Sequence, residues 1–190
     1  MNKLVVKAIT AVLFVFILAS CQEEVYPKPP AFLRLNYPQA NYIGFESQCP
    51  FTFDINSEAA KQIEIKSDCN IVIKYPAMKA SLFLSYKPVG GNIDSLLADA
   101  QKLTFNHVIK ADEIIELPFT NEKNNVYGMF YEVGGDAATN AQFYITDNAR
   151  HFIRGSVYFY SKPNFDSIMP AVSYMKDDMK TLMETLRWKE

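Results

Sequence analysis

The sequence predicts an α+β fold in which an antiparallel sheet is flanked by a middle helix and by a long C-terminal helix. Three observations carry this prediction. Short runs of alternating apolar residues recur along most of the chain, which is typical of half-buried strands. Residues 92–103 place apolar side chains on one helical face, and residues 166–187 carry a longer stripe of the same period. Helices on both faces of such a sheet would bury its apolar residues.

The N-terminal residues 1–20 form a targeting segment, which we exclude from the fold. Lys3 and Lys7 supply its positive charge, and the apolar run that follows is shorter than the roughly 20 residues that span a bilayer. Small residues then precede Cys21 in the order Leu-Ala-Ser-Cys, which is a lipobox. We expect cleavage before Cys21 and acylation there, with palmitate among the chains. Two or three acyl chains hold firmly, because each buried CH₂ contributes about 0.8 kcal/mol.

The rest of the chain is predicted to be a lipidated tether over residues 21–30 and one globular domain over residues 31–190. The proline-rich part of the tether favours extended polyproline geometry. Without Lys3 and Lys7, 17 basic residues stand against 21 acidic ones, a net charge of −4. This charge lacks the basic footprint of a nucleic-acid-binding protein, so the membrane and other proteins are the expected partners.

The strand patterns of the first half lie at residues 32–35, 42–45, 51–55, 62–65, 71–75 and 81–86. Turn-forming pairs such as Asn56-Ser57 separate them. The middle helix follows Gly90-Gly91, with Asn92 as a suitable cap for its first turn. Strand patterns return at residues 113–117, 126–133, 142–146 and 152–160.

The C-terminal helix is predicted over residues 166–187, with Pro170 tolerated in its first turn. Its stripe is rich in methionine, which suits either a groove for a partner or, as we expect, the core. Aromatic residues crowd the late strands and point to both faces, which favours a core position for the set as a whole; an exposed part of it would be a docking surface for protein or glycan. The order of elements is similar to that of PsbP-like and Mog1-like sandwiches.

Cys49 and Cys69 are the two cysteines left after lipidation of Cys21. In an exported protein they are expected to form a disulfide, which would contribute about 3 kcal/mol; two buried free thiols are the alternative. The pair has no neighbouring histidines with which to hold a metal. The Gly-Gly pairs lack the residues of a phosphate-binding or dinucleotide-binding loop. We therefore expect neither a metal nor a cofactor.

The candidate chemical residues are Asp147, His151 and Arg154, within the stretch Thr-Asp-Asn-Ala-Arg-His-Phe-Ile-Arg-Gly. Asp147 and His151 could form an acid–base pair across a turn, which would suit a hydrolase acting on the envelope. They could equally satisfy the turn's own backbone, and this interpretation is preferred. A Ser85–His151–Asp147 triad can be listed, but no sequence motif supports it. His107 is a lone histidine beside apolar residues, so a structural role is expected. A carrier of small ligands would need a large apolar cavity.

Several strings, taken in order, resemble one family along the whole chain. They are Tyr26-Pro27-Lys28-Pro29, Phe32-Leu33-Arg34-Leu35, Cys49-Pro50-Phe51, Leu84-Ser85-Tyr86-Lys87, His107-Val108-Ile109-Lys110-Ala111-Asp112, Val126-Tyr127-Gly128, Gln142-Phe143-Tyr144, Thr146-Asp147, His151-Phe152-Ile153-Arg154-Gly155, Pro163-Asn164-Phe165-Asp166-Ser167, Glu184-Thr185 and Trp188. The family is GldD, the gliding motility lipoproteins. The resemblance implies a non-enzymatic, lipid-anchored component of the gliding machinery and of its linked protein secretion system, with no catalytic residue, cofactor or metal to carry over.

The residue after Cys21 bears on the location. Gln22 is not the Asp that is associated with retention in the inner membrane of some bacteria, so the outer membrane is favoured. The stretch Gln22-Glu23-Glu24 resembles an acidic signal for the cell surface. We expect the periplasmic face, with the cell surface as the alternative.

Overall fold

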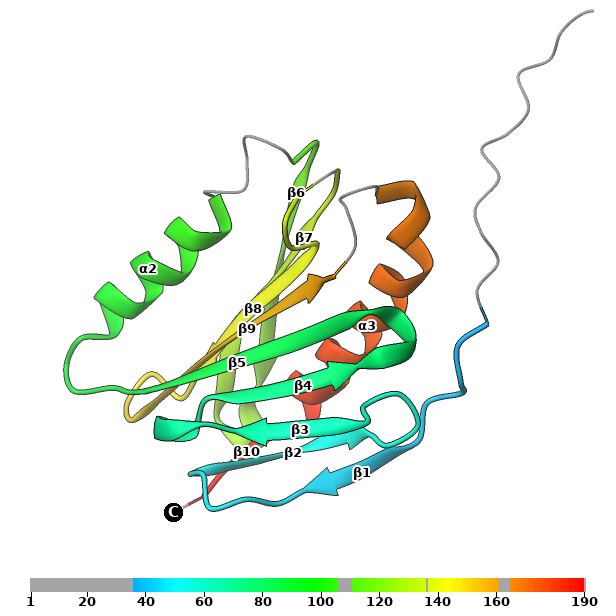
Figure 1. Ribbon diagram of the computed structural model, residues 1–190. Coiled ribbons are helices and arrows are strands. Elements are labelled where there is room, and N and C mark those ends of the chain that lie inside the picture. The colour runs from blue at the N-terminus through cyan, green and yellow to red at the C-terminus, as the bar shows by residue number, and fades with distance from the viewer. Residues whose placement is uncertain (1–35, 106–110, 136, 161–164, 190) are drawn as a thin grey trace, which may run out of the picture. The chain divides into compact units, whose positions relative to one another are not determined.

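The computed structural model describes residues 36–105, 111–135, 137–160 and 165–189 (Figure 1). The targeting segment, Cys21, the tether, the strand predicted at residues 32–35 and His107 lie outside the described residues.

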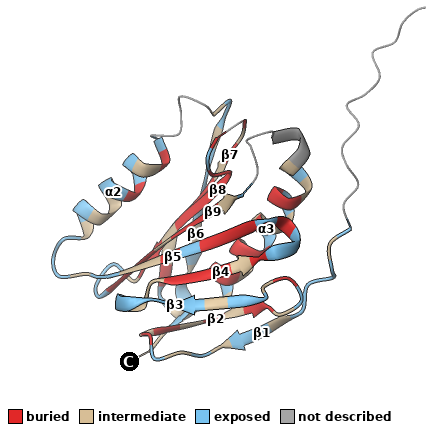
Figure 2. Cartoon of the chain, in the orientation of Figure 1, coloured by how far each residue is buried: buried red, intermediate tan, exposed pale blue. Residues whose placement is uncertain are grey.

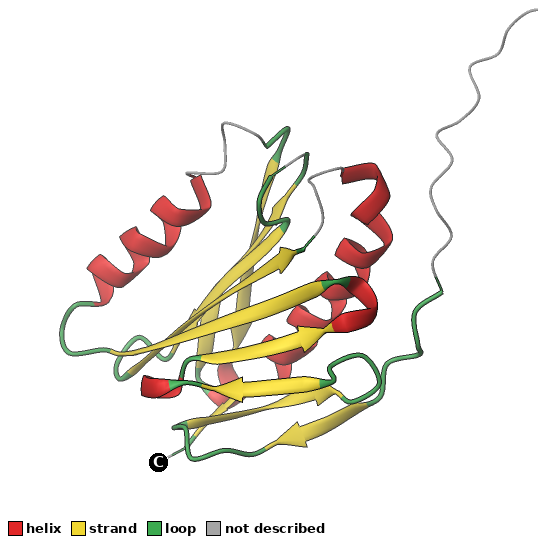
Figure 3. Ribbon diagram, in the orientation of Figure 1, coloured by secondary structure: helices red, strands yellow, loops and turns green. Residues whose placement is uncertain are grey.

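The fold class is confirmed, because the described residues form antiparallel sheets with a middle and a C-terminal helix (Figure 3). The strands are β1 (Tyr42–Phe45), β2 (Phe51–Asn56), β3 (Gln62–Ile65), β4 (Ile71–Tyr75), β5 (Ala80–Pro88), β6 (Ile114–Asn121), β7 (Val126–Val133), β8 (Ala141–Thr146), β9 (His151–Phe159) and β10 (Arg187–Trp188). The helices are α2 (Ile93–Phe105) and α3 (Phe165–Thr185), and the short 3₁₀ turns are η1 (Ser67–Cys69), η2 (Pro76–Met78) and η3 (Glu122–Asn124).

The main sheet has seven strands in the order β3-β4-β5-β9-β8-β7-β6, all antiparallel. Its centre is the pairing of β5 with β9, which runs from Ala80 opposite Phe159 to Pro88 opposite His151. This pairing joins the early hairpins to the late ones, while α2 carries the chain towards the far edge (Figure 1). A smaller sheet has the order β1-β2-β10.

Helix α3 packs its buried face on one face of the main sheet and contributes to the core there (Figure 2). Met175, Met179 and Met183 are at most 1% exposed, so the methionine stripe belongs mainly to the core. Successive strand residues point to opposite faces, and the alternate residues that meet α3 include Leu82, Phe143, Ile145 and Ile153. Phe51 and Phe53 of β2 complete the same cluster.

The disulfide between Cys49 and Cys69 ties the two sheets together. Cys49 precedes β2 of the small sheet, and Cys69 ends η1, just before β4 of the main sheet. Their Cα atoms are 5.5 Å apart, and Cys49 is buried.

Three of the differences from the predictions concern α3 and β6. Pro170 lies inside α3 and not in its first turn, although proline cannot donate the helical hydrogen bond there. The helix ends at Thr185, because Arg187 and Trp188 leave it to pair with Thr52 and Phe51 of β2. Strand β6 continues past residue 117 through Pro118, which an edge strand tolerates because the missing N–H faces away from the ladder.

Helix α2 lies on the side of the main sheet away from α3 (Figure 1). Only Ala100 and Thr104 are buried among its residues, and Phe105 is 45% exposed. Asn92 precedes the helix, and its side-chain oxygen accepts from the N–H of Gly90.

Candidate functional site

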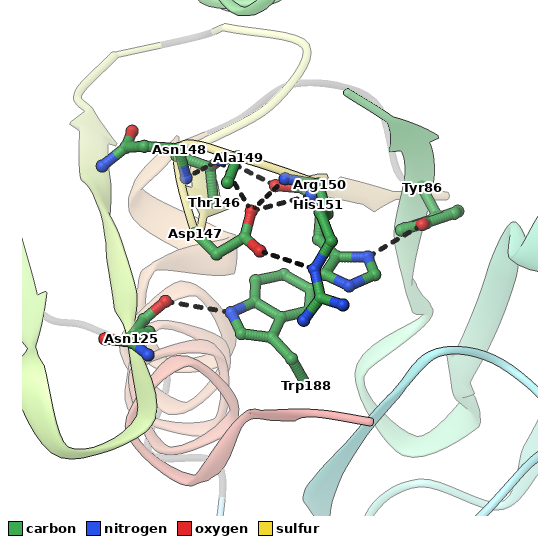
Figure 4. A network of polar contacts seen from close by, with 9 residues as sticks. All are labelled: Tyr86, Asn125, Thr146, Asp147, Asn148, Ala149, Arg150, His151 and Trp188. Carbon is green, nitrogen blue, oxygen red and sulfur yellow. Dashed lines mark hydrogen bonds and ion pairs between the residues drawn. The ribbon is translucent and has the colours of Figure 1, made fainter. Parts of the chain in front are cut away.

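Two of the three candidate chemical residues lie where β8 turns into β9: Asp147 is in the turn and His151 is the first residue of β9 (Figure 4). Asp147 Oδ1 accepts hydrogen bonds from the backbone N–H groups of Ala149, Arg150 and His151, at 3.0, 2.8 and 2.8 Å. Thr146 Oγ1 donates to the carbonyl of His151 at 2.6 Å and accepts from the N–H of Asn148 at 2.9 Å. The side chains of the turn thus satisfy its own backbone.

The carboxylate of Asp147 is held by the backbone of this turn. Burial alone would raise its pKa, but the three N–H donors stabilise the charged form and hold the pKa below its ordinary value. Its other oxygen, Oδ2, lies 3.9 Å from Nε of Arg150, which is an exposed ion pair of little energetic weight.

His151 is enclosed by aromatic side chains and is only 8% exposed. Its Nδ1 is 2.9 Å from the hydroxyl of Tyr86, and its ring stacks on Trp188 with centroids 4.9 Å apart. Trp188 is fixed in turn, because its Nε1 donates to the carbonyl of Asn125 at 3.0 Å. Burial lowers the pKa of His151, so the ring is neutral near pH 7.

The other two candidate residues, Ser85 and Arg154, lie outside this cluster. Tyr86 points towards His151, so its neighbour Ser85 points to the opposite face of β5. There Ser85 lies opposite Arg154, which is half-buried and also faces Tyr144 across the sheet. Arg154 has no ion-pair partner within the described part of the chain. A triad of Ser85, His151 and Asp147 is therefore not assembled.

Sequence reasoning missed Tyr86 and Trp188 as partners of His151, because they come from strands 65 and 37 residues away and no local pattern links them. It also missed a buried carboxylate. Asp178 of α3 is 5% exposed and accepts from Tyr42 Oη at 2.8 Å and from Asn56 Nδ2 at 3.0 Å. Burial raises the pKa of Asp178, although these hydrogen bonds oppose the shift. The cluster fastens α3 to β1 and β2.

A surface hollow lies between the start of β6 and the first half of α3. It holds about 300 Å³ and is lined by Asp112, Glu113, Ile115, Glu132, Gly134, Gly135, Met169 and Lys176. A second hollow of about 250 Å³ shares three of these residues and continues to Lys180. We refer to the two hollows together, with their lining residues, as the β6–α3 groove.

An ion-pair network shapes the wall of this groove. The carboxylate of Glu132 binds Nζ of Lys176 at 2.7 Å and Nζ of Lys180 at 2.9 Å. Burial would raise the pKa of Glu132, but the two ammonium groups hold it below its ordinary value. Nζ of Lys180 also lies 5.1 Å from the ring centre of Phe130.

The described residues contain no group of three or more His, Cys, Asp or Glu side chains placed to hold a metal. Among the helices of that same part of the chain, none has the length and apolar character to cross a membrane.

Comparison with known proteins gives one match. A family model described as gliding motility lipoprotein GldD matches residues 22–188. No curated protein and no solved structure matches the chain. The similarity to PsbP-like and Mog1-like sandwiches therefore stays a prediction.

Proposed function

The chain belongs to the GldD family of gliding motility lipoproteins, and on this premise we propose that it is a non-enzymatic assembly or binding module of the gliding machinery. The proposal extends to the protein secretion system linked to that machinery. The observation that carries it is the span of the family match, which covers residues 22–188. The family is described by motility and lipidation, not by a catalysed reaction.

The geometry of the β8–β9 turn supports the non-enzymatic part of the proposal. A general base must reach a substrate proton, but Asp147 Oδ1 already accepts three backbone hydrogen bonds. His151 is stacked against Trp188 and bonded to Tyr86. Both residues have structural partners that account for their positions. These contacts count against the alternative of an envelope-acting hydrolase that uses Asp147 and His151.

The mode of anchoring is part of the proposal. Residues 1–20 would be removed, Cys21 would carry the acyl chains, and residues 31–190 would work as one domain on a tether. Ten extended tether residues would reach at most about 30–35 Å from the lipid. We propose the periplasmic face of the outer membrane as the location, and proteolysis of intact cells tests it, since only a surface-exposed chain would be digested.

The central experiment is deletion of the gene in the host, followed by complementation. The deletion strain should fail to spread on agar, and the wild-type chain should restore spreading. Cys21→Ala should abolish labelling by palmitate and restore spreading poorly. Normal spreading by the deletion strain would disprove the proposed role.

A second complementation experiment distinguishes a non-enzymatic binding module from an enzyme. The double variant Asp147→Asn and His151→Gln removes acid–base chemistry and keeps hydrogen-bonding side chains at both positions. If it is present at the normal level, it should restore spreading fully. A folded but inactive double variant would favour the hydrolase.

A further inference from the structure

The β6–α3 groove exists because the main sheet is wider than the helix that covers it. A helix is about 10 Å wide and covers roughly two strands, which lie about 4.8 Å apart. Strand β6 is the last of seven strands, and its side chains at 115 and 117 lie on the α3 face, since those residues pair with Glu132 and Phe130. Ile115 is 42% exposed and Leu117 is 37% exposed. On α3, Met169 is also 39% exposed.

These three side chains flank a wall that is already ordered. Lys176 and Lys180 are held by Glu132, with about a fifth of the Lys176 and Glu132 side chains exposed. A partner that docks here would therefore find fixed side chains and would have less ordering entropy to lose. The groove combines apolar contact points with a preformed polar wall, as protein-binding surfaces do.

The backbone of β6 favours a helix over a strand as the occupant. No other strand of the described residues pairs with the outer edge of β6. An added strand would use that edge, but Pro118 in its middle has no N–H to donate. A helix makes no such demand, because it satisfies its own backbone and binds through side chains.

The charge of the groove indicates the charge of the residues that flank the apolar face of the bound helix. The two lysines of the wall already share Glu132. Asp112 and Glu113 line the same hollow, are exposed, and have no ion-pair partner among the described residues. The uncompensated charge is acidic, so a complementary partner is basic there.

We propose that the β6–α3 groove binds an amphipathic helix of another envelope protein. Its apolar residues, spaced i, i+3 or i+4, and i+7, would rest on Ile115, Leu117 and Met169. Its lysine or arginine residues would face Asp112 and Glu113. This inference rests on the proposed function and identifies the surface with which the module engages its partner.

The test is photo-cross-linking in living cells in which this chain is the only copy. A benzophenone amino acid replaces Ile115 of the groove, or Ile65 as a matched control, because Ile65 is an exposed strand isoleucine outside the groove. Mass spectrometry of the cross-linked peptide should identify a segment of another protein with helical apolar spacing and basic residues. Cross-links to a second copy, to an extended segment or to lipid would overturn the proposal, as would equal products from both positions.

Variants measure the contribution of each part of the groove. With the probe at Ile115, Met169→Lys or Glu113→Lys should reduce the cross-linked yield about tenfold, as the loss of an interface anchor does. Ile65→Lys and Asp99→Lys place lysine at an exposed apolar and an exposed acidic position elsewhere and should leave the yield unchanged. Unchanged yield in both groove variants would refute the assignment.

Spreading separates this inference from the function on which it rests. The double variant Ile115→Lys and Leu117→Lys should fail to restore spreading at a normal protein level, while Ile65→Lys restores it. If the deletion strain is immobile and the double variant spreads normally, only the groove assignment fails. If the deletion strain itself spreads, the proposed function fails.

Discussion

Asp147 and His151 are four residues apart, yet their side chains have different structural roles. The carboxylate of Asp147 closes a turn by accepting three backbone hydrogen bonds. The ring of His151 packs between Tyr86 and Trp188 and brings the ends of β5, β9 and β10 together. A lowered pKa in each case therefore reports a structural role, since such shifts also arise in networks that do no chemistry.

The stability of the protein should depend on the charge of His151. Its pKa is lower in the folded state than the ordinary 6.5, because burial disfavours the charged ring. The stability that neutral His151 provides is present above the unfolded pKa and is lost as the pH falls through the folded pKa. Urea unfolding between about pH 5 and 8 should show this loss in the wild type. His151→Gln should show a flatter profile, and parallel profiles would contradict the prediction.

Asp178 should behave in the opposite sense. Burial raises its folded pKa above the ordinary 3.8, so its contribution to stability is fully present below the unfolded pKa and is lost as the pH rises through the raised folded pKa. Asp178→Asn should remove this dependence, while Asp178→Leu should cost about 1–3 kcal/mol by leaving Tyr42 and Asn56 without a partner. The free energies of unfolding at about pH 4 and pH 7 test both statements. A wild type that gains stability relative to Asp178→Asn on going to pH 7 would disprove the assignment.

At the scale of elements, two strands meet through a glycine and an aromatic ring. Gly155 of β9 lies opposite Phe143 of β8, and a Cβ at 155 would overlap atoms Cε1 and Cζ of that ring. Glycine thus permits the ring to lie flat across the neighbouring strand. The close approach joins two residues that are 12 positions apart in the sequence, Gly155 and Phe143, and the Phe143 ring belongs to the core.

Gly155→Ala should destabilise the protein by about 1–3 kcal/mol through overpacking. Phe143→Leu removes the clashing ring atoms, so the double variant should be more stable than the sum of the single effects predicts. A double-mutant cycle by chemical denaturation should give a coupling of at least about 0.5 kcal/mol. Additive effects would show that the two residues do not constrain each other.

The elements themselves were largely predictable, because their periodicity is local. The apolar run at residues 71–75 and the stripe that holds Met175 and Met179 correspond to β4 and α3. The misses have non-local causes: Arg187 was predicted to be helical, but it pairs with Thr52 of β2, and the neighbouring Trp188 is held by β2, Asn125 and His151. For the candidate site, the local turn of Asp147 was predictable, whereas the partners of His151 and the burial of Asp178 were not.

At the scale of the whole molecule, the disulfide links the small sheet covalently to the main sheet. It closes a loop with a sequence separation of 20 between Cys49 and Cys69. Such a cross-link lowers the conformational entropy of the unfolded chain, and it suits the oxidising compartment expected for an exported lipoprotein.

Reduction of this bond should lower the free energy of unfolding by about 3 kcal/mol. The double variant Cys49→Ala and Cys69→Ala should show a comparable loss and should no longer respond to a reducing agent. Denaturation with and without the reductant measures both. An equal effect of the reductant on wild type and variant would show that the bond is not responsible.

The position of that bond has a mechanical consequence if the protein is anchored through its N-terminal end, as we propose. Tension that enters the described chain from its N-terminal side first meets β1, whose Tyr42 is tied to Asp178 of α3. If β1 peels away, the pull arrives next at Cys49 and passes through sulfur directly to Cys69, at the margin of the main sheet. Unravelling from the moored end would halt there, and the groove at the opposite edge of the sheet would keep its shape under strain.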